Sequence, residues 1–270
     1  MQERTRIIAC QMRLDGTVVR VDVPKMITPT LADRLRMQHR PSGPAVMKQQ
    51  WAELLFLHGR MDARELQKRL PKGLWIDTFE NEAWVGIVPF FMNRIRPCYL
   101  PAVPGISWFL ELNVRTYVHD DAGNPGVWFF SLDCNQALAV SLAQQFFHLP
   151  YEHANMQASQ QDGLIDYACQ RDGENSVAHY RYEACREGKE ATAGTLEHFL
   201  LERYRLFSAN EAGHIFTGDV HHAPYRFQQA HCEIMSPLPA LWDGLEFPIE
   251  SVLSAETVNV EVFPLRHHHC

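Results

Sequence analysis

Residues 111–118 read ELNVRTYV and alternate strictly between two kinds of side chain. With a strand's period of two, four hydrogen-bonding residues share one face: Glu111, Asn113, Arg115 and Tyr117. The proline-rich approach at 97–107 and the apolar segment 127–130, a hairpin partner, indicate that this strand lies inside the molecule. Polar groups aligned in an interior form either a satisfied structural network or a ligand cavity.

The rest of the chain alternates short strands with turn signals, which predicts hairpins rather than crossovers. Strands are expected at 51–58, 74–79 and 83–92. Helices are expected at 63–70 after an Asp62 cap, at 135–149 and at 195–204. This pattern predicts an α+β, mainly antiparallel fold, a closed β-cone or barrel with two or three short helices.

The N-terminal part differs from the remainder. Residues 1–46 are weakly patterned, and we expect an arm that could be partly disordered. Residues 47–266 are expected to form a single β domain. The histidine run at 267–269 receives no function.

Composition excludes several classes of protein. The chain has 270 residues, 46% hydrophobic and 21% charged, and a net charge of −7, which argues against a nucleic-acid partner. It holds no apolar run of about 18 residues and no signal-peptide pattern, so we expect no membrane partner. Seven scattered cysteines without a C-x-x-C pair indicate reduced thiols in the cytoplasm. No motif for a cofactor appears, and no histidine pair has helical ligand spacing with a third ligand nearby, so neither cofactor nor metal is expected.

Several ordered motifs resemble the YqjF-like family, bacterial proteins of unknown function within the acetoacetate decarboxylase-like superfamily. They are WAELLFLH at 51–58, LPKGL at 70–74, IDTF at 76–79, AWVGIVPF at 83–90, ELNVRTYV at 111–118, FFSLD at 129–133 and FLLERY at 199–204. The resemblance runs from about residue 28 to the C-terminus. It implies a β-cone or barrel with an interior cavity, often in a homo-oligomer, and no established activity.

The superfamily's decarboxylases resemble one another in using a lysine Schiff base, which requires a free amine. This chain has five lysines, and none lies between Lys72 and Lys189, the stretch that holds the central strands. Arg115 stands where the resemblance would place the lysine. A guanidinium stays protonated and forms no carbinolamine, which argues against Schiff-base decarboxylation.

Arg115 can instead hold a carboxylate in a bidentate grip, with Asn113 and Tyr117 beside it. Glu111 could neutralise Arg115 or act as a general base, and His58 is a second candidate base. One hairpin register sets Ser131 across from Arg115 and Asp133 across from Asn113, adding both to the ligand-binding face. A slip of one residue sends both to the opposite face.

Two interpretations stay open at this point. The first is a small-molecule-binding protein with an interior cavity for a carboxylate or keto-acid-like ligand. Turnover stays undecided, and any enzymatic activity is expected to proceed without a lysine Schiff base. The alternative is a non-catalytic structural or interaction protein, in which a buried Glu111–Arg115 pair and its neighbours Asn113 and Tyr117 only order the core.

Overall fold

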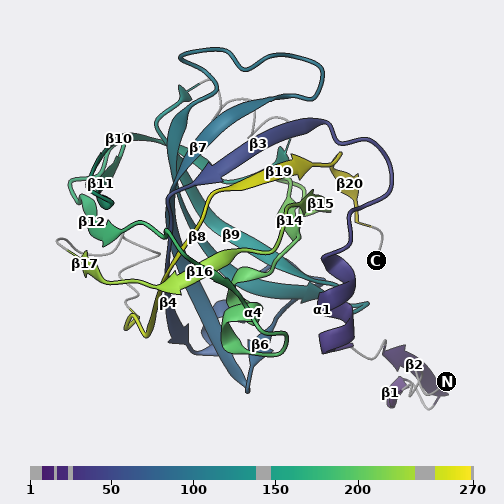
Figure 1. Cartoon of the computed structure of the whole chain (residues 1–270). Coiled ribbons are helices and arrows are strands. Elements are labelled where there is room, and N and C mark those ends of the chain that lie inside the picture. The colour runs from purple at the N-terminus through teal and green to yellow at the C-terminus, as the bar shows by residue number, and fades with distance from the viewer. Residues whose placement is uncertain (1–7, 15–16, 24–26, 138–146, 235–246, 269–270) are drawn as a thin grey trace.

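The strands close into a ring, which encloses the interior of the molecule (Figure 1). The computed structural model describes all residues except 1–7, 15–16, 24–26, 138–146, 235–246 and 269–270. The ring is made by β3 (Met47–Ala52), β7 (Glu82–Pro97), β8 (Phe109–Asp120), β9 (Pro125–Cys134), β14 (Arg205–Ala209), β15 (Ile215–His221) and β19 (Val258–Val262). It runs β8–β7–β3–β19–β15–β14–β9 and returns to β8.

Further strands extend this ring. They are β4 (Leu54–Met61), β5 (Leu74–Ile76), β6 (Thr78–Phe79), β13 (Lys189–Glu190), β16 (Arg226–Gln229), β18 (Ser251–Ala255) and β20 (Arg266–His267). A side lobe, at the left in Figure 1, consists of β10 (Tyr151–Gln161), β11 (Leu164–Arg171), β12 (Ala178–Glu183) and β17 (Cys232–Ile234). The hairpin of β1 (Ile8–Leu14) and β2 (Thr17–Val23) pairs within itself. The predicted α+β class with a closed, mainly antiparallel sheet is confirmed.

Two details of the predicted strands were wrong. The strand expected at 51–58 is two strands, because Glu53 adopts a left-handed φ of 51° that breaks the ladder between β3 and β4. Hairpins do not account for the whole sheet either, since β9 pairs in parallel with both β10 and β14. Parallel neighbours require long connections, and no short turn signal announces them.

Three short helices are described. They are α1 (Leu31–Met37), α2 (Ala63–Gln67) and α4 (Leu196–Leu201). Asp62 caps α2 as expected, its carboxylate accepting the backbone N–H groups of Arg64 and Glu65. α2 and α4 end earlier than the sequence pattern suggested. The helix expected at 135–149 falls largely on residues 138–146, outside the described part of the chain.

The N-terminal region contacts the barrel through α1. Arg34 binds Asp77 in a bidentate ion pair, with N–O distances of 2.5 and 2.7 Å. The division of the chain at residue 46 stays a prediction. Among the described residues, no helix is both long and apolar enough to cross a membrane.

β8 is buried on both of its faces. Leu112 and Val114 belong to an apolar cluster under the β10–β12 lobe, with Tyr167 and Ile165. The opposite face, which carries Glu111, Asn113, Arg115 and Tyr117, looks into the ring. The expectation that this polar face lies inside the molecule is therefore confirmed by its burial, with Arg115 retaining partial exposure.

Candidate functional site

His58, Gly86 and Arg115 stand side by side on β4, β7 and β8. The ladder pairs His58 with Gly86 and Gly86 with Arg115. A Cβ atom on Gly86 would lie 3.0 Å from Cδ2 of His58 and 3.6 Å from Cγ of Arg115. Because glycine leaves this space empty, the imidazole and the arginine side chain can meet over the middle strand.

Tyr117 fixes the protonation of His58. Its hydroxyl oxygen lies 2.9 Å from Nε2 of His58 and 2.9 Å from the carbonyl oxygen of Leu200. A carbonyl only accepts, so the hydroxyl proton goes to Leu200, and Nε2 of His58 must donate to the tyrosine oxygen. Burial, and next the charge of Arg115, lower the pKa of His58 well below its usual value. His58 is therefore neutral, and its buried Nδ1 is an acceptor that finds no hydrogen-bond partner among the described residues.

The Leu200 carbonyl is available because helix α4 ends there. Thr195 caps the start of α4 by accepting the His198 N–H. The last carbonyls of a helix have no partner within it, and they carry its partial negative charge. The carbonyl of Leu200 accepts from Tyr117 and, at 3.4 Å, from Nη2 of Arg115.

Arg115 has no acidic partner among the described residues. Its Nη2 lies 3.4 Å from the Leu200 carbonyl oxygen, and its Cζ lies 5.4 and 5.9 Å from the ring centres of Phe56 and Tyr117. Its Nε is buried and has no hydrogen-bond partner among the described residues. The other buried arginine of this region, Arg203, is bound to Asp77 at 2.9 Å. Arg115 is only partly buried, so part of its side chain stays accessible to solvent. A guanidinium with free donors and adjacent space is suited to bind an anion.

His222, which directly follows β15, is a second buried histidine, and the sequence pattern did not indicate it as a ligand-binding residue. Its Nδ1 is 2.7 Å from the carbonyl oxygen of Ala223, so Nδ1 carries the proton. Its Nε2 is buried, and within the described part of the chain it has no hydrogen-bond partner. Burial, with a smaller contribution from Arg115, lowers its pKa to about 4. His222 is thus a second neutral imidazole with a free acceptor nitrogen.

Aromatic rings connect the two histidines. The ring of Phe56 is 6.1 Å from that of His58 and 5.6 Å from that of Tyr225, and Tyr225 is 4.6 Å from His222. Tyr204 stacks on His222, with ring centres 4.6 Å apart.

Glu202 holds this aromatic arrangement in place. Its carboxylate accepts from the Tyr204 hydroxyl, and at 2.9 Å from the backbone N–H of Tyr225. The alternation of side chains along the strands did not indicate Glu202, Tyr204 or Tyr225 as part of this region, because they come together only in the folded protein.

Glu111 lies apart from Arg115. Its carboxylate accepts from the Tyr151 hydroxyl at 2.9 Å and from the Asn113 side chain. Three strand residues lie between it and Arg115, and the described ion pairs do not join the two. The expected Glu111–Arg115 pair is therefore absent from the described chain. Burial raises the pKa of Glu111 to about 7.

Ser131 and Asp133 do not join the interior face, so their assignment to the ligand-binding residues was wrong, and the hairpin has the register shifted by one residue. Ser131 lies across from Val114, and Asp133 lies across from Leu112, on the lobe side of β8. A β-bulge inserts Phe130 between the partners of Val114 and Arg115 and shifts the register by one residue. Asp133 instead binds Nε of Arg171 at 2.7 Å.

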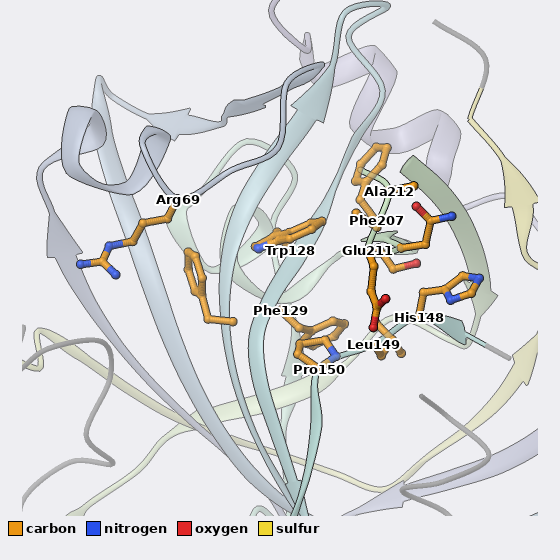
Figure 2. Close-up of a pocket in the computed structure, with 13 residues that line it drawn as sticks. Arg69, Trp128, Phe129, His148, Leu149, Pro150, Phe207, Glu211 and Ala212 are labelled. Atoms are coloured by element: carbon orange, nitrogen blue, oxygen red, sulfur yellow. The ribbon is translucent and has the colours of Figure 1, made fainter. Parts of the chain in front are cut away.

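A surface pocket of about 880 Å³ lies outside this site (Figure 2). It borders the part of β9 between its pairing with β14, at 127–128, and its pairing with β10, at 132–134. Phe129 lines the pocket and also contacts the apolar cluster that contains Tyr117 and Leu200. The pocket is lined by Arg69, Trp128, Phe129, Phe130, His148, Leu149, Pro150, Phe207, Ser208, Ala209, Asn210, Glu211 and Ala212.

Within the described residues no group of acidic, histidine and cysteine side chains could hold a metal ion. Five cysteines of this part are free thiols. The arrangement around Arg115 therefore offers a cation, two neutral imidazole acceptors and aromatic walls.

Residues 48–258 match the DUF2071 profile, described as an uncharacterized conserved protein. The chain belongs to the DUF2071 family. A family relative, the uncharacterized protein YqjF of Bacillus subtilis (strain 168), is 36% identical over 229 residues, which cover 84% of this chain and 94% of YqjF. The resemblance inferred from the motifs is thereby confirmed.

Solved structures share the fold of this DUF2071 protein at low sequence identity. An acetoacetate decarboxylase-like enzyme from Sphingomonas wittichii RW1 is 12% identical with a TM-score of 0.60, covering 84% of this chain and 94% of its own. The enduracididine biosynthesis enzyme MppR, complexed with pyruvate, is 12% identical with a TM-score of 0.59, covering 84% and 91%. Acetoacetate decarboxylase from Legionella pneumophila is 13% identical with a TM-score of 0.57, covering 85% and 88%.

Proposed function

We propose that this protein binds a small organic acid inside the ring and that Arg115 holds its carboxylate. The observation that carries the proposal is the missing acidic partner of Arg115 in the described chain, together with its unpartnered Nε. An interior cation without a counter-charge is costly, and a bound carboxylate would offset that cost. A fold neighbour, MppR, is complexed with pyruvate, which is an acid of this kind.

The chemistry at this site would proceed without a Schiff base, because the residue beside His58 and Gly86 is an arginine. His58 is a candidate base, because it is neutral, lies one strand away from Arg115 across Gly86, and has a free acceptor nitrogen in Nδ1. Glu111 is less well placed, since its carboxyl group is engaged by Tyr151 and Asn113. Enolisation, dehydration and hydrolysis are the reaction classes that fit one neutral base and one cation.

A thermal-shift screen tests the binding step. Small carboxylates, keto acids and sugar acids should raise the melting temperature of the wild-type protein and leave that of Arg115→Gln unchanged. Arg205→Gln is the matched control, because Arg205 binds Asp219 at 2.7 Å away from the ring interior. It should keep the ligand-induced shifts.

Two outcomes would contradict the proposal. Arg115→Gln could fold and respond to the acids as the wild type does. The second outcome is that none of the acids changes the melting temperature of the wild type, while Arg115→Gln loses several kcal/mol of stability. That result would support the structural interpretation.

A further inference from the structure

Asp77 is shared by two arginines that come from distant parts of the chain. Its buried carboxylate, between β5 and β6, accepts from both Nη atoms of Arg34 at 2.5 and 2.7 Å and from Nη1 of Arg203 at 2.9 Å. Its backbone N–H donates to the carbonyl oxygen of Tyr117 at 2.9 Å. Since Arg34 belongs to α1 and Arg203 follows α4, this carboxylate joins the N-terminal helix to the end of α4, beside β8.

Arg203 holds the end of α4. Its Nε donates to the carbonyl oxygen of Phe199 at 2.8 Å, and its Cζ lies 4.3 and 4.9 Å from the ring centres of Phe199 and Tyr117. The next carbonyl along the helix is that of Leu200, which accepts from the Tyr117 hydroxyl and from Arg115. Arg203 therefore contacts the carbonyl that directly precedes the one in the Arg115 site.

One nitrogen of Arg203 is unused. Its Nη2 is buried and has no hydrogen-bond partner among the described residues. A guanidinium that already binds one oxygen of a carboxylate gains by placing a second nitrogen on the other oxygen, because the forked contact is stronger and satisfies one more donor. Here the other oxygen, Oδ1 of Asp77, is bound by Nη2 of Arg34. Arg34 thus keeps Arg203 on a single oxygen of Asp77.

The docking of α1 depends on this ion pair. Its two leucines, Leu31 and Leu35, are 43% and 36% exposed, so the helix buries little of its apolar surface against the barrel. Arg34 reaches inward instead, with its Cζ 4.9 Å from the ring centre of Phe199 and its Nη atoms on Asp77. Loss of the pair would therefore release the helix from α4.

Building on the proposed function, we infer that Arg34 and Arg203 are positioning residues for the acid bound by Arg115, and that docking of α1 raises the affinity of this site. With Arg34 on Asp77, Nε of Arg203 stays on its helix carbonyl. The end of α4 then presents its last carbonyls in the arrangement that orients Arg115.

Arg203 is the group that changes between the two states. When α1 leaves, Oδ1 of Asp77 becomes a buried acceptor without a donor, and the free Nη2 of Arg203 turns to satisfy it. The planar guanidinium moves as a unit, so this turn draws Nε away from the Phe199 carbonyl. The end of α4 shifts as a result, and the grip of Arg115 on a carboxylate weakens.

Hydrogen exchange tests the coupling without any variant. Because linked equilibria are reciprocal, an acid that binds more tightly when α1 is docked must also favour docking by the same factor. The screened acids, among them pyruvate, propionate and gluconate, should slow amide exchange in Leu31–Met37 of the wild type by about tenfold at saturation. The same acids should leave the exchange of α1 unchanged in Arg115→Gln.

Calorimetric titration at pH 7 tests the two positioning contacts. Arg34→Gln should bind each acid about tenfold more weakly than the wild type. Arg34→Lys keeps the charge but presents a single nitrogen, which cannot cover both oxygens of Asp77, so it should bind as weakly as Arg34→Gln. Arg36→Gln is the matched control, because Arg36 pairs with Asp33 of the same helix at 2.7 Å. This control should keep the wild-type affinity.

The failures can be told apart. An acid that binds the wild type without slowing exchange in α1 overturns the inference while the proposed function stands. Wild-type affinity in folded Arg34→Gln also overturns it, and wild-type affinity in Arg34→Lys does so by showing that charge alone is sufficient. Absence of binding by every acid overturns the proposed function together with the inference.

Discussion

The hydroxyl oxygen of Tyr117 lies 2.9 Å from Nε2 of His58 and uses its one proton on the carbonyl of Leu200. This relationship decides which nitrogen of His58 carries hydrogen and which is free. It also connects β4, β8 and the end of α4 at one point inside the ring. The candidate site therefore depends on the packing of α4 as much as on the sheet.

Tyr117→Phe should destabilise the protein by about 1–3 kcal/mol, because the His58 N–H loses its acceptor in a buried place. Urea unfolding would measure this cost. Tyr167→Phe is a suitable comparison, since its hydroxyl donates to the backbone carbonyl of Glu111 at 2.8 Å and is also buried. Both variants should lose stability, and only Tyr117→Phe should weaken acid binding. Equal ligand affinity in the two would separate Tyr117 from the site.

Gly86→Ala should disturb His58 and Arg115 together. The new Cβ would approach Cδ2 of His58 to 3.0 Å, which requires the ring to move. We expect a loss of about 1–3 kcal/mol on unfolding and weaker binding of carboxylates. Gly218→Ala provides a control of similar crowding, against the flexible ends of Leu206 and Leu265. Full carboxylate affinity in Gly86→Ala would show that the His58–Arg115 contact is not needed.

Glu111 should make the protein less stable as the pH rises. Its pKa is about 7 in the folded protein and 4.5 ordinarily, so between these values the folded state holds a proton that the unfolded chain has released. Stability therefore falls through this range, by an amount on the order of 3 kcal/mol that is complete above about pH 7.

Glu111→Gln mimics the protonated acid and should remove this component. The free energy of unfolding should be measured for the variant and the wild type from pH 5 to 8.5. The difference, variant minus wild type, should increase as the pH rises. The surroundings of this residue are the same in both proteins. Tyr151 and Asn113 are its hydrogen-bond partners, and Asp133 is a nearby charge. Parallel pH profiles would mean that Glu111 is ionised in the folded state.

Arg115→Lys should create an amine where the wild type has a guanidinium. Burial lowers the pKa of a lysine, and the free amine can condense with a ketone. With pyruvate and borohydride, mass spectrometry should find a reduced adduct on the residue at 115 in this variant and none in the wild type or in Arg115→Gln. A folded Arg115→Lys protein that is not trapped would contradict the claim that a small keto acid reaches this position.

The sequence allowed the interior face of β8 to be predicted because alternation is a local property of one strand. The positions of Ser131 and Asp133 were not predictable, since a bulge at Phe130 leaves no distinct mark within the apolar run 127–130. His222 was not predicted for a different reason: it follows β15, which is joined to β9 only through the parallel pairing of β14 with β9, and this pairing has no local sequence signal. The same alternation placed Glu111 and Arg115 on one face and so allowed an ion pair between them. The distance between these positions along an extended strand is too long for that pair.

A crystal structure of the protein with the tightest-binding carboxylate tests the central claim most directly. The account predicts electron density for the carboxylate within hydrogen-bonding distance of the Arg115 guanidinium, inside the ring and beside Phe56. Density for the acid in the outer pocket beside Trp128 and Phe207, with the surroundings of Arg115 unchanged, would contradict it.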